Sequence, residues 1–499
     1  MQLHRLYAAI VTLVFSHFIF AQCELPMVVL ITSYNNSKWV KHNLHSVFMQ
    51  QYENYRIIYI DDASNDKTAD IVEMYAKEKN QLHRFTIIQN KKNRGTLANH
   101  YSAVHTCQDH EIVVHLDGDD FFKHKNVLKK VNNTYQSKDV WLTYGQNEEI
   151  CIDKNGKLYT IKGECRDTSK SVRKANAYRE IQWLYTHLKT YYAGLFKHIK
   201  LKSLFENGSF FESATDTSMM FCMLEMSGGK FKFIDEILYV YNTLNPIRHY
   251  NVRLLKQVRC KSVARTMEKY KPLKVDSLPK RNIPKNAMAD LIIISENKPE
   301  LLKKLIDSVH CYCTGIDKIH IIHGSNEFKK ILEETIASIH NEHIILAKEN
   351  MCFKNFVDIS NCIRLLEQTY AYGFYLSLGK NINKNSIICR NQNLPLCQEI
   401  EDGIYAWQFR FGEYDWKKPN NLLMTLYRKK DILKSIKEKN YNSTETLVDN
   451  WNLEPFGTDN IGLFFAESKA IEIVDNSTNM LDLFLLINNA IQIKDEKEK

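Results

Sequence analysis

Short apolar runs alternate with helical patterns along the first part of the chain. Between the first two runs, Val40, Leu44 and Val47 recur at the spacing of one face of a helix. Runs without polar interruption are typical of strands buried on both faces of a parallel sheet. The pattern therefore predicts an α/β domain of the doubly wound type. Its strand-length runs are Met27–Thr32, Tyr55–Ile60, Phe85–Gln89 and Ile112–Leu116.

Polar residues follow three of these runs at the point where each strand is expected to end. Ser33-Tyr34-Asn35 follows the first run, Asp61-Asp62 the second and Asp117-Gly118-Asp119 the fourth. In open α/β sheets, ligands bind beyond the carboxyl ends of the strands. We therefore expect these side chains to converge on one ligand-binding edge.

The last of these polar stretches has the chemistry of a cation site. In extended chain, residues two apart point the same way, so Asp117 and Asp119 can face one ligand. A hard divalent cation relieves the repulsion between two carboxylates and accepts oxygen ligands. An acidic surface turn is the alternative, and the other polar strand ends favour the metal site over it.

The order of these motifs resembles the family 2 glycosyltransferases of GT-A fold (nucleotide-diphospho-sugar transferases). The resemblance rests on Asp61-Asp62-Ala-Ser-Asn-Asp, on Asn93-Arg-Gly95 with Asn99, and on Leu116-Asp-Gly-Asp-Asp120. It covers residues 25–250, the first expected domain. Its motifs are specific for the fold but not for the sugar.

The resemblance implies a nucleotide-sugar site at the strand ends. Asp117 and Asp119 would be the DxD motif, which contacts the ribose and a Mn²⁺ or Mg²⁺ ion on the diphosphate. The first strand end and Asp61 would hold the nucleobase and ribose. The full set expected to bind the donor is Thr32, Ser33, Tyr34, Asn35, Asp61, Asp62, Asn93, Gly95, Asn99, Asp117 and Asp119.

The family also uses an acidic residue before a helix as the base that deprotonates the acceptor hydroxyl, and it transfers with inversion. Asp216 is the expected base, because Thr215-Asp216 stands where the family commonly has Glu-Asp. That departure leaves Glu212 as a rival. A helix N-cap is the alternative role for Asp216.

Between the DxD motif and the base, the family builds part of its acceptor site. Trp183, His187 and Lys189 are the acceptor candidates here, since aromatic and basic residues suit stacking on a sugar and pairing with phosphate. A core helix with a charged face is an equally good interpretation. No Arg precedes Trp183, so the motif of processive polysaccharide synthases is incomplete.

A second domain is expected over residues 287–499, after a helix and Pro-containing linker at 251–286. The run Ala289–Ser295 and the turn after Ile322 repeat the opening of the first domain. We expect Tyr372–Leu378 to be the counterpart of the DxD strand. Gly379, Lys380 and Asn381 then replace the acids, which predicts a GT-A-like domain without a DxD motif.

Composition adds limits to this picture. The net charge of +9 is spread along the chain, which gives little support for nucleic acid as a partner. The 12 cysteines show no zinc-like spacing. Residues 1–21 contain an apolar run of about 15 residues, shorter than the roughly 20 of a membrane-spanning helix. We interpret it as a signal peptide, with a membrane anchor as the alternative.

The resemblance, together with the N-terminal apolar run, implies a secreted, periplasmic or secretory-lumen glycosyltransferase that is inverting and metal-dependent. It would move a sugar from a nucleotide donor, by family habit UDP-linked, to a hydroxyl of a glycan, lipid or protein. The alternatives are an inactive nucleotide- or glycan-binding protein and, less favoured, a nucleotidyltransferase, because no phosphate loop follows the first strand. Export conflicts with the cytosolic origin of activated sugars unless the compartment imports them.

Overall fold

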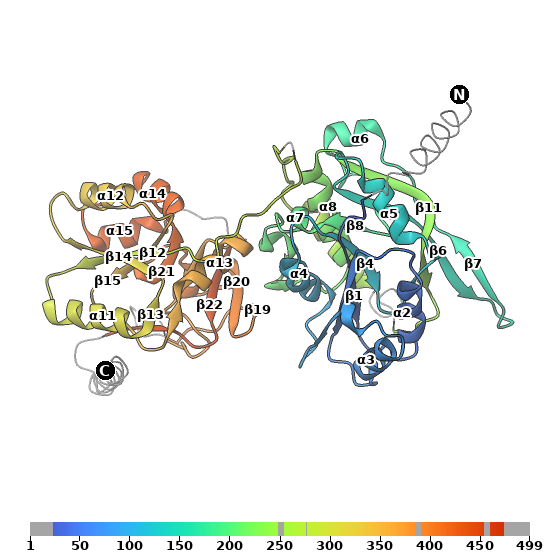
Figure 1. Ribbon diagram of the computed structural model, residues 1–499. Coiled ribbons are helices and arrows are strands. Elements are labelled where there is room, and N and C mark those ends of the chain that lie inside the picture. Colours follow the sequence, from blue (N-terminus) through green and yellow to red (C-terminus); the bar gives the residue numbers. More distant parts are fainter. Residues whose placement is uncertain (1–22, 248–253, 276, 385–390, 454–459, 474–499) are drawn as a thin grey trace, which may run out of the picture. The chain divides into compact units, whose positions relative to one another are not determined.

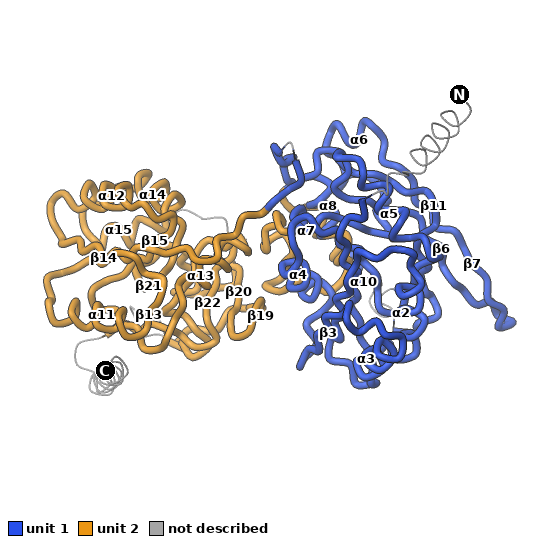
Figure 2. Tube along the Cα trace, viewed as in Figure 1, with its two compact units in different colours: residues 1–196, 219–258, 269–280 blue, residues 197–218, 259–268, 281–499 orange. Residues whose placement is uncertain are grey.

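The computed structural model describes residues 23–247, 254–275, 277–384, 391–453 and 460–473. The signal-peptide prediction lies outside these residues. The chain divides into two compact units (Figure 2). Unit 1 comprises residues 1–196, 219–258 and 269–280, and unit 2 comprises 197–218, 259–268 and 281–499. Within the described part of the chain, no helix has the length and apolar character needed to cross a membrane.

Unit 1 is built on a nine-stranded mixed sheet (Figure 1). Its strands run in the order β3-β2-β1-β4-β8-β6-β11-β5, and β7 adds to β6. The first four are parallel and the rest include antiparallel pairs. The bounds are β1 Met27–Ser33, β2 Tyr55–Asp61, β3 Phe85–Gln89, β4 Ile112–Asp117, β5 Phe121–Phe122, β6 Leu142–Ile152, β7 Leu158–Lys162, β8 Thr190–Tyr192 and β11 Phe231–Asn242.

The predicted strands and helices of this unit are confirmed. Every residue of β1 is buried, as expected for a parallel strand covered on both faces. Helix α2 buries Val40, Leu44 and Val47, the residues that carried the helical pattern. The helices are α2 Val40–Phe48, α3 Thr68–Glu78, α4 Thr96–Thr106, α5 Val127–Tyr135, α6 Lys170–Ala175 and α7 Ala193–Phe196, with a 3₁₀ turn at Leu82–Arg84.

In two helices, the first or last residues belong to one unit and the remaining residues to the other. These helices are α8 (Thr215–Ser227) and α10 (Leu254–Thr266). Residues 197–218 and 259–268 pack with unit 2, although they precede the expected second domain. This early part of unit 2 contains a 3₁₀ turn at Leu201–Leu204 and the short strands β9 (Phe205–Glu206) and β10 (Ser209–Phe210).

Unit 2 contains an eight-stranded sheet of its own, in the order β14-β12-β15-β21-β18-β22-β20-β19. Strands β14, β12 and β15 are parallel, and β21 begins the antiparallel part. The strands are β12 Ala289–Ser295, β14 Ile316–His323, β15 His343–Lys348, β18 Gly373–Tyr375, β19 Cys397–Glu401, β20 Ile404–Gln408, β21 Leu423–Arg428 and β22 Ile461–Phe465.

Helices and short strands complete unit 2. The helices are α11 Pro299–Tyr312, α12 Phe328–Ser338, α13 Ile359–Thr369, α14 Lys429–Lys437 and α15 Thr444–Trp451, with 3₁₀ turns at Phe409–Phe411 and Tyr414–Lys417. The short strands are β13 Cys313–Thr314, β16 Met351–Phe353, β17 Val357–Asp358 and β23 Ala470–Glu472.

The expected position of the DxD counterpart in unit 2 is wrong. In unit 1, β4 lies beside β1, and Asp117 is opposite Thr32. In unit 2 the strand beside β12 is β15, with Lys348 opposite Ile294, whereas β18 lies between β21 and β22. The counterpart of the DxD motif is therefore Lys348-Glu349-Asn350, and not Gly379-Lys380-Asn381.

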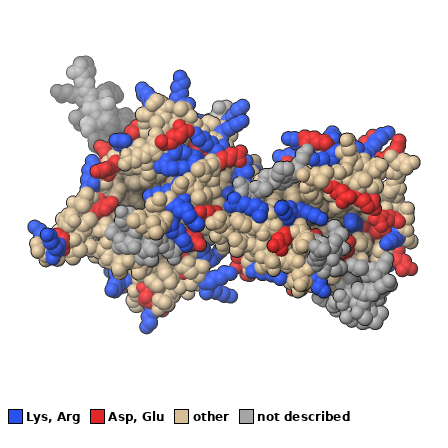
Figure 3. All heavy atoms as spheres, turned by 180° about the vertical axis from the view of Figure 1, so that it is seen from behind, with Lys and Arg blue, Asp and Glu red and all other residues tan. Residues whose placement is uncertain are grey.

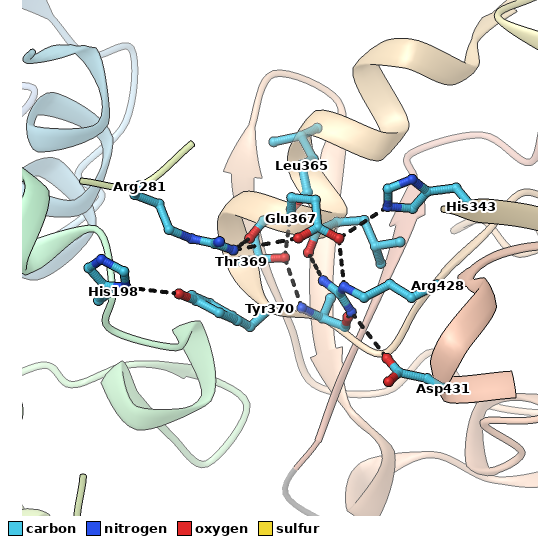
Figure 4. Close-up of polar contacts among 11 residues, drawn as sticks. His198, Arg281, His343, Leu365, Glu367, Thr369, Tyr370, Arg428 and Asp431 are labelled. Atoms are coloured by element: carbon cyan, nitrogen blue, oxygen red, sulfur yellow. Dashed lines mark hydrogen bonds and ion pairs between the residues drawn. The ribbon is translucent and has the colours of Figure 1, made fainter. Parts of the chain in front are cut away.

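A partly buried ion cluster stabilises unit 2 at the beginning of β15 (Figure 4). Glu367, on α13, accepts hydrogen bonds from His343 Nε2 at 3.1 Å and Arg428 Nε at 2.6 Å. Arg428 also donates to the carbonyl oxygens of Leu366 and Ala371, which lie at the end of α13. Burial alone would raise the pKa of Glu367, but these partners lower it to about 2.

Candidate active site

The polar residues after β1, β2 and β4 meet at one edge of the unit 1 sheet. The parallel register places Ser33 opposite Asp61, and Thr32 opposite Asp117. Because these strands are neighbours, Thr32 and Asp117 become adjacent although they are 85 positions apart in sequence. The predicted convergence of the three strand ends is therefore confirmed.

The loop after β1 is fixed by the loop after β2. Asn35 has a positive φ of 53°, and its backbone N–H donates to Ser64 Oγ at 2.8 Å. The Asn65 N–H donates to Asn35 Oδ1 at 3.0 Å. Tyr34 is 43% exposed, so its ring is accessible at this edge. The loop thus offers a rigid backbone and one exposed aromatic side chain.

Asp61 is a buried residue at the same sheet edge, where β2 ends. Its carboxylate accepts a short hydrogen bond from Ser64 Oγ and a longer one from the Ser64 N–H. Burial raises the pKa of Asp61, and Ser64 partly offsets that effect. Asp61 therefore retains a polar, oriented carboxylate at the end of β2, which suits hydrogen bonding to a hydroxyl.

Asp62 has a different environment. Its carboxylate accepts hydrogen bonds from the backbone N–H groups of Arg94 and Gly95, each at 2.8 Å, and from Asn90 Nδ2. Gly95 is the N-cap of α4 and has a φ of 85°, a conformation that favours glycine. Asp62 thus shapes the loop at the N-terminus of α4.

Asn93 and Asn99 extend this arrangement. Asn93 Nδ2 donates to the carbonyl oxygen of Asp62 at 3.2 Å. Asn99 Oδ1 accepts from Asn90 at 2.8 Å, and the buried Asn99 Nδ2 has no hydrogen-bond partner among the described residues. Asn93 and Asn99 thus stabilise the loop around Asp62 and Asn90. Their direct contact with a donor stays a prediction.

Asp117 ends β4 near His115, His187 and Lys189. His115 Nε2 lies 3.1 Å from Asp117 Oδ1. The Tyr239 hydroxyl is 3.4 Å from Oδ2. Burial opposes ionisation of Asp117, but His115, His187 and Lys189 outweigh it and hold the pKa well below its usual value. The carboxylate is therefore kept ionised and oriented.

Gly118 allows the close approach of two strand ends. A Cβ atom at this position would lie 2.5 Å from Ser33 Oγ and 2.6 Å from Ser33 Cβ. Its N–H donates to the carbonyl oxygen of Thr32 at 3.0 Å. A glycine between the two aspartates is thus required by packing against β1.

Asp119 is held by a residue from the loop after β11. Asn245 Nδ2 donates to Asp119 Oδ2 at 2.7 Å and to Asn36 Oδ1 at 3.1 Å. Asn242 Nδ2 donates to the Asp119 carbonyl oxygen at 3.1 Å. Since Asn245 is only 4% exposed, it fixes one carboxylate oxygen of Asp119 from inside the unit.

The third acid, Asp120, is structural. It is 1% exposed and accepts hydrogen bonds from the Tyr239 hydroxyl at 2.6 Å and the Asn242 N–H at 2.7 Å. Burial, with repulsion from Asp119 and Asp117, raises its pKa. Asp120 therefore joins the end of β4 to β11.

The three predicted acceptor residues differ in their burial and in their contacts. Lys189 is 1% exposed, and its Nζ lies 3.1 Å from His187 Nδ1. The His187 ring stacks on Tyr239 at 4.4 Å between centroids. Trp183 packs edge-on against Tyr185 and Phe221. The buried Lys189 contributes charge behind Asp117, a placement that does not favour contact with an acceptor.

The oxygen-rich edge fits a hard divalent cation by its chemistry. Asp117 and Asp119 supply carboxylate oxygens, which Mn²⁺ and Mg²⁺ prefer. Within the described residues, no group of three or more His, Cys, Asp or Glu side chains is arranged to hold a metal by itself. A cation at this edge would therefore need further oxygens from its ligand.

Comparison with known proteins agrees with the motifs. Residues 28–198 match the model of glycosyl transferase family 2. This segment is a family 2 glycosyltransferase domain.

Curated relatives match the family 2 domain over part of their length. A Bacillus subtilis (strain 168) protein, provisionally named the teichuronic acid biosynthesis glycosyltransferase TuaG, is 33% identical over 106 residues, which are 21% of this chain and 40% of that protein. An uncharacterized glycosyltransferase of Haemophilus influenzae is 32% identical over 131 residues, 26% of this chain and 39% of that protein. The chain thus spans about 40% of these relatives.

Solved structures overlap more weakly. Residues 1–349 of S. aureus TarS with UDP-GlcNAc are 18% identical, with 44% of this chain and 59% of that chain covered and a TM-score of 0.32. The mannosyltransferase PcManGT of Pyrobaculum calidifontis with GDP-Man and Mn²⁺ is 16% identical, with coverages of 50% and 66% and a TM-score of 0.34. TM-scores this low do not add to the family assignment.

The candidate base lies outside the matched segment. Asp216 is the second residue of α8, so it occupies the first helical turn and not the N-cap position. Its Oδ1 accepts the Thr217 N–H at 2.8 Å. Residues 197–218 belong to unit 2, and the roles of Asp216 and its rival Glu212 stay predictions.

Sequence reasoning missed the residues that orient the DxD aspartates. Tyr239 and Asn245 follow Asp117 and Asp119 by 122 and 126 positions. They reach the family 2 domain only because β11 pairs with β5 and β6. The Tyr-Asn-Thr-Leu-Asn sequence at 241–245 was the available signal, since amides that follow a strand can reach the sheet edge.

Proposed function

We propose that the chain is a metal-dependent, inverting glycosyltransferase that moves a sugar from a nucleotide diphosphate to an acceptor hydroxyl. One observation carries the proposal. Asp117 and Asp119 lie at the same sheet edge as Asp61, with the end of β1 between them, and each is oriented by a buried partner, His115 and Asn245 respectively. Oriented oxygen ligands at a strand-end edge suit a cation-bound diphosphate.

The residues of this edge would divide the binding task. Asp61 would accept hydrogen bonds from ribose hydroxyls, while exposed Tyr34 would pack on the nucleobase. Asp117 and Asp119 would hold Mn²⁺ or Mg²⁺, which when bound supplies charge neutralisation to the departing diphosphate. The Gly118 approach to Ser33 keeps both aspartates beside β1.

The remaining parts of the proposal concern the acceptor and the compartment. Asp216 would take the proton from the attacking hydroxyl, a single displacement that inverts the anomeric carbon. The donor would carry UDP, and the acceptor would be a glycan, lipid or protein. The apolar run within residues 1–21 supports export as a signal peptide.

The binding step is tested by calorimetric titration of UDP into the full chain, with and without Mn²⁺. We expect Mn²⁺ to be required, and Asp119→Asn to weaken binding by about 100-fold or more because it removes an anionic cation ligand. Asp139→Asn, at an exposed position of the same unit, is the matched control. Equal binding by wild type and Asp119→Asn would reject the cation site.

Catalysis is tested separately with Asp216→Asn. This variant should bind UDP normally and lose transfer, whereas Glu212→Gln should retain transfer. Loss in Glu212→Gln alone would reassign the base. Metal-dependent UDP binding with no transfer from any nucleotide sugar would instead favour the inactive nucleotide-binding protein.

A further inference from the structure

Strands β6 and β7 form a hairpin that projects from the sheet of unit 1 (Figure 1). Ile152 lies opposite Leu158, and Cys151 opposite Tyr159, next to the turn. The carboxylate of Asp153 closes the turn by accepting the N–H groups of Asn155 at 2.9 Å and Lys157 at 2.8 Å. The hairpin therefore has a defined register and a well-formed tip.

The outer part of this hairpin exposes large apolar side chains. Ile152 is 54% exposed, Leu158 58%, Tyr159 45% and Ile161 47%. A single exposed apolar residue needs no explanation, but a cluster of four on one hairpin is typical of an interaction site. An exposed edge strand without such a role would be a liability for aggregation.

The apolar residues occupy both faces of the hairpin. Side chains alternate along a strand, so Tyr159 and Ile161 point to one face, and Leu158 points to the other. Directly opposed residues share a face, which adds Ile152 to the side of Leu158. A protein partner docking on a sheet covers one face, whereas immersion in an apolar medium covers both.

Cationic side chains surround the apolar tip. Lys154 and Lys157 are exposed in the turn, and no ion pair engages either of them within the described part of the chain. Lys162 follows on β7, 3.8 Å from Asp235. Among the acids of the hairpin, Asp153 accepts hydrogen bonds from the backbone of the turn, and Glu149 lies opposite Ile161. Figure 3 shows Lys or Arg side chains, together with Asp or Glu, at this projecting end.

We propose that the β6–β7 hairpin docks unit 1 onto an anionic phospholipid bilayer. Its aliphatic and tyrosine side chains enter the boundary between headgroups and acyl chains, and its lysines pair with lipid phosphates and carboxylates. Interfacial segments combine apolar and Lys-rich surface in this way. The docking does not depend on the proposed transfer reaction.

The first test places the photoreactive amino acid p-benzoylphenylalanine at position 161 of the full chain. Irradiation with vesicles that contain phosphatidylglycerol should yield a lipid adduct. The same residue at position 453, where Leu453 is 73% exposed in unit 2, is the matched control. A lipid adduct at 161 and not at 453 supports docking. Absence of a lipid adduct at 161, or cross-linking to a second copy instead, overturns it.

The second test measures sedimentation with vesicles. Leu158→Ser combined with Ile161→Ser should weaken binding by about tenfold or more, since apolar burial drives interfacial binding. Lys154→Gln with Lys157→Gln should weaken it about 25-fold, or about fivefold for each lysine, on anionic vesicles only. Leu453→Ser is the control, and unchanged circular dichroism verifies folding. Unaltered binding of both double variants overturns the proposal.

Discussion

The two units place opposite chemistry at the same point of similar sheets. The compared point is the end of the strand that pairs with the first strand of each sheet, which is β4 in unit 1 and β15 in unit 2. Unit 1 has Asp117-Gly118-Asp119 there, and unit 2 has Lys348-Glu349-Asn350. The backbone contact is the same in both, because Gly118 N–H donates to Thr32 at 3.0 Å and Glu349 N–H to Ile294 at 3.1 Å. Similar topology therefore does not bring similar binding chemistry.

The middle residue shows how the difference arises. Gly118 leaves room for Ser33, whereas Glu349 reaches the equivalent Ser295, whose Oγ donates to its carboxylate at 2.5 Å. Glu349 also accepts the Lys298 N–H at 3.2 Å, just before α11. In unit 2 the Glu349 side chain therefore occupies the end of the sheet beside Ser295, and Lys348 would repel a cation.

The largest contrast is expected between Asp117→Ala and Lys348→Ala. Asp117→Ala should weaken Mn²⁺-dependent UDP binding by about 100-fold or more, because a cation ligand is lost. Lys348→Ala should change it less than about twofold, since unit 2 supplies no cation ligand there. Calorimetric titration of both full-length variants measures the difference. Equal losses would mean that unit 2 also binds the donor.

A large stability effect is expected from Glu367→Gln, at the opposite end of β15 from Lys348. The folded pKa of Glu367 is about 2, below its usual value. Its ionic partners therefore stabilise the fold above the unfolded pKa of roughly 4.3, by about 2–3 kcal/mol. This stabilisation is lost as the pH falls from there through about 2.

Urea unfolding of wild type and Glu367→Gln, followed by hydrogen exchange in unit 2 peptides, measures this effect. The difference between the two proteins should be largest at neutral pH and shrink below pH 4. A difference that does not change with pH would show that the Glu367 charge is not the source of stability.

A smaller effect is expected for Asn245, which orients Asp119. Asn245→Ala should weaken Mn²⁺-dependent UDP binding about 10–100-fold, as is typical for residues that hold a metal ligand. Asn350→Ala, at the counterpart of Asp119 itself, should leave binding unchanged. Asn245→Gln should restore part of the affinity by returning an amide donor. No loss in Asn245→Ala would limit this residue to a structural role.

The smallest effect is expected from adding one methyl group at each strand end. Gly118→Ala should destabilise unit 1 by about 1–2 kcal/mol, because its Cβ would overlap Ser33. Gly324→Ala in unit 2 meets no atom within 4 Å and should be nearly neutral. Thermal unfolding monitored by exchange in each unit compares them. Equal destabilisation would remove packing as the reason for Gly118.

The parallel strands and their ligand edge could be predicted because apolar runs and the residues that follow them are local in sequence. The partners of those residues could not. Tyr239 and Asn245 depend on the pairing of β11, and the role of Asp62 depends on the N-terminus of α4. The DxD counterpart was misplaced because unit 2 reaches β15 directly from β14, without an equivalent of β3.

The interleaved division of the chain has a consequence for its synthesis. Residues 197–218 leave the ribosome long before the segments that they contact, such as Gln408, which accepts the Gly208 N–H at 3.1 Å. Unit 2 therefore cannot complete its structure until the last part of the chain has emerged. Chaperones that hold the nascent protein would have to protect this early segment, and a truncated product would expose it.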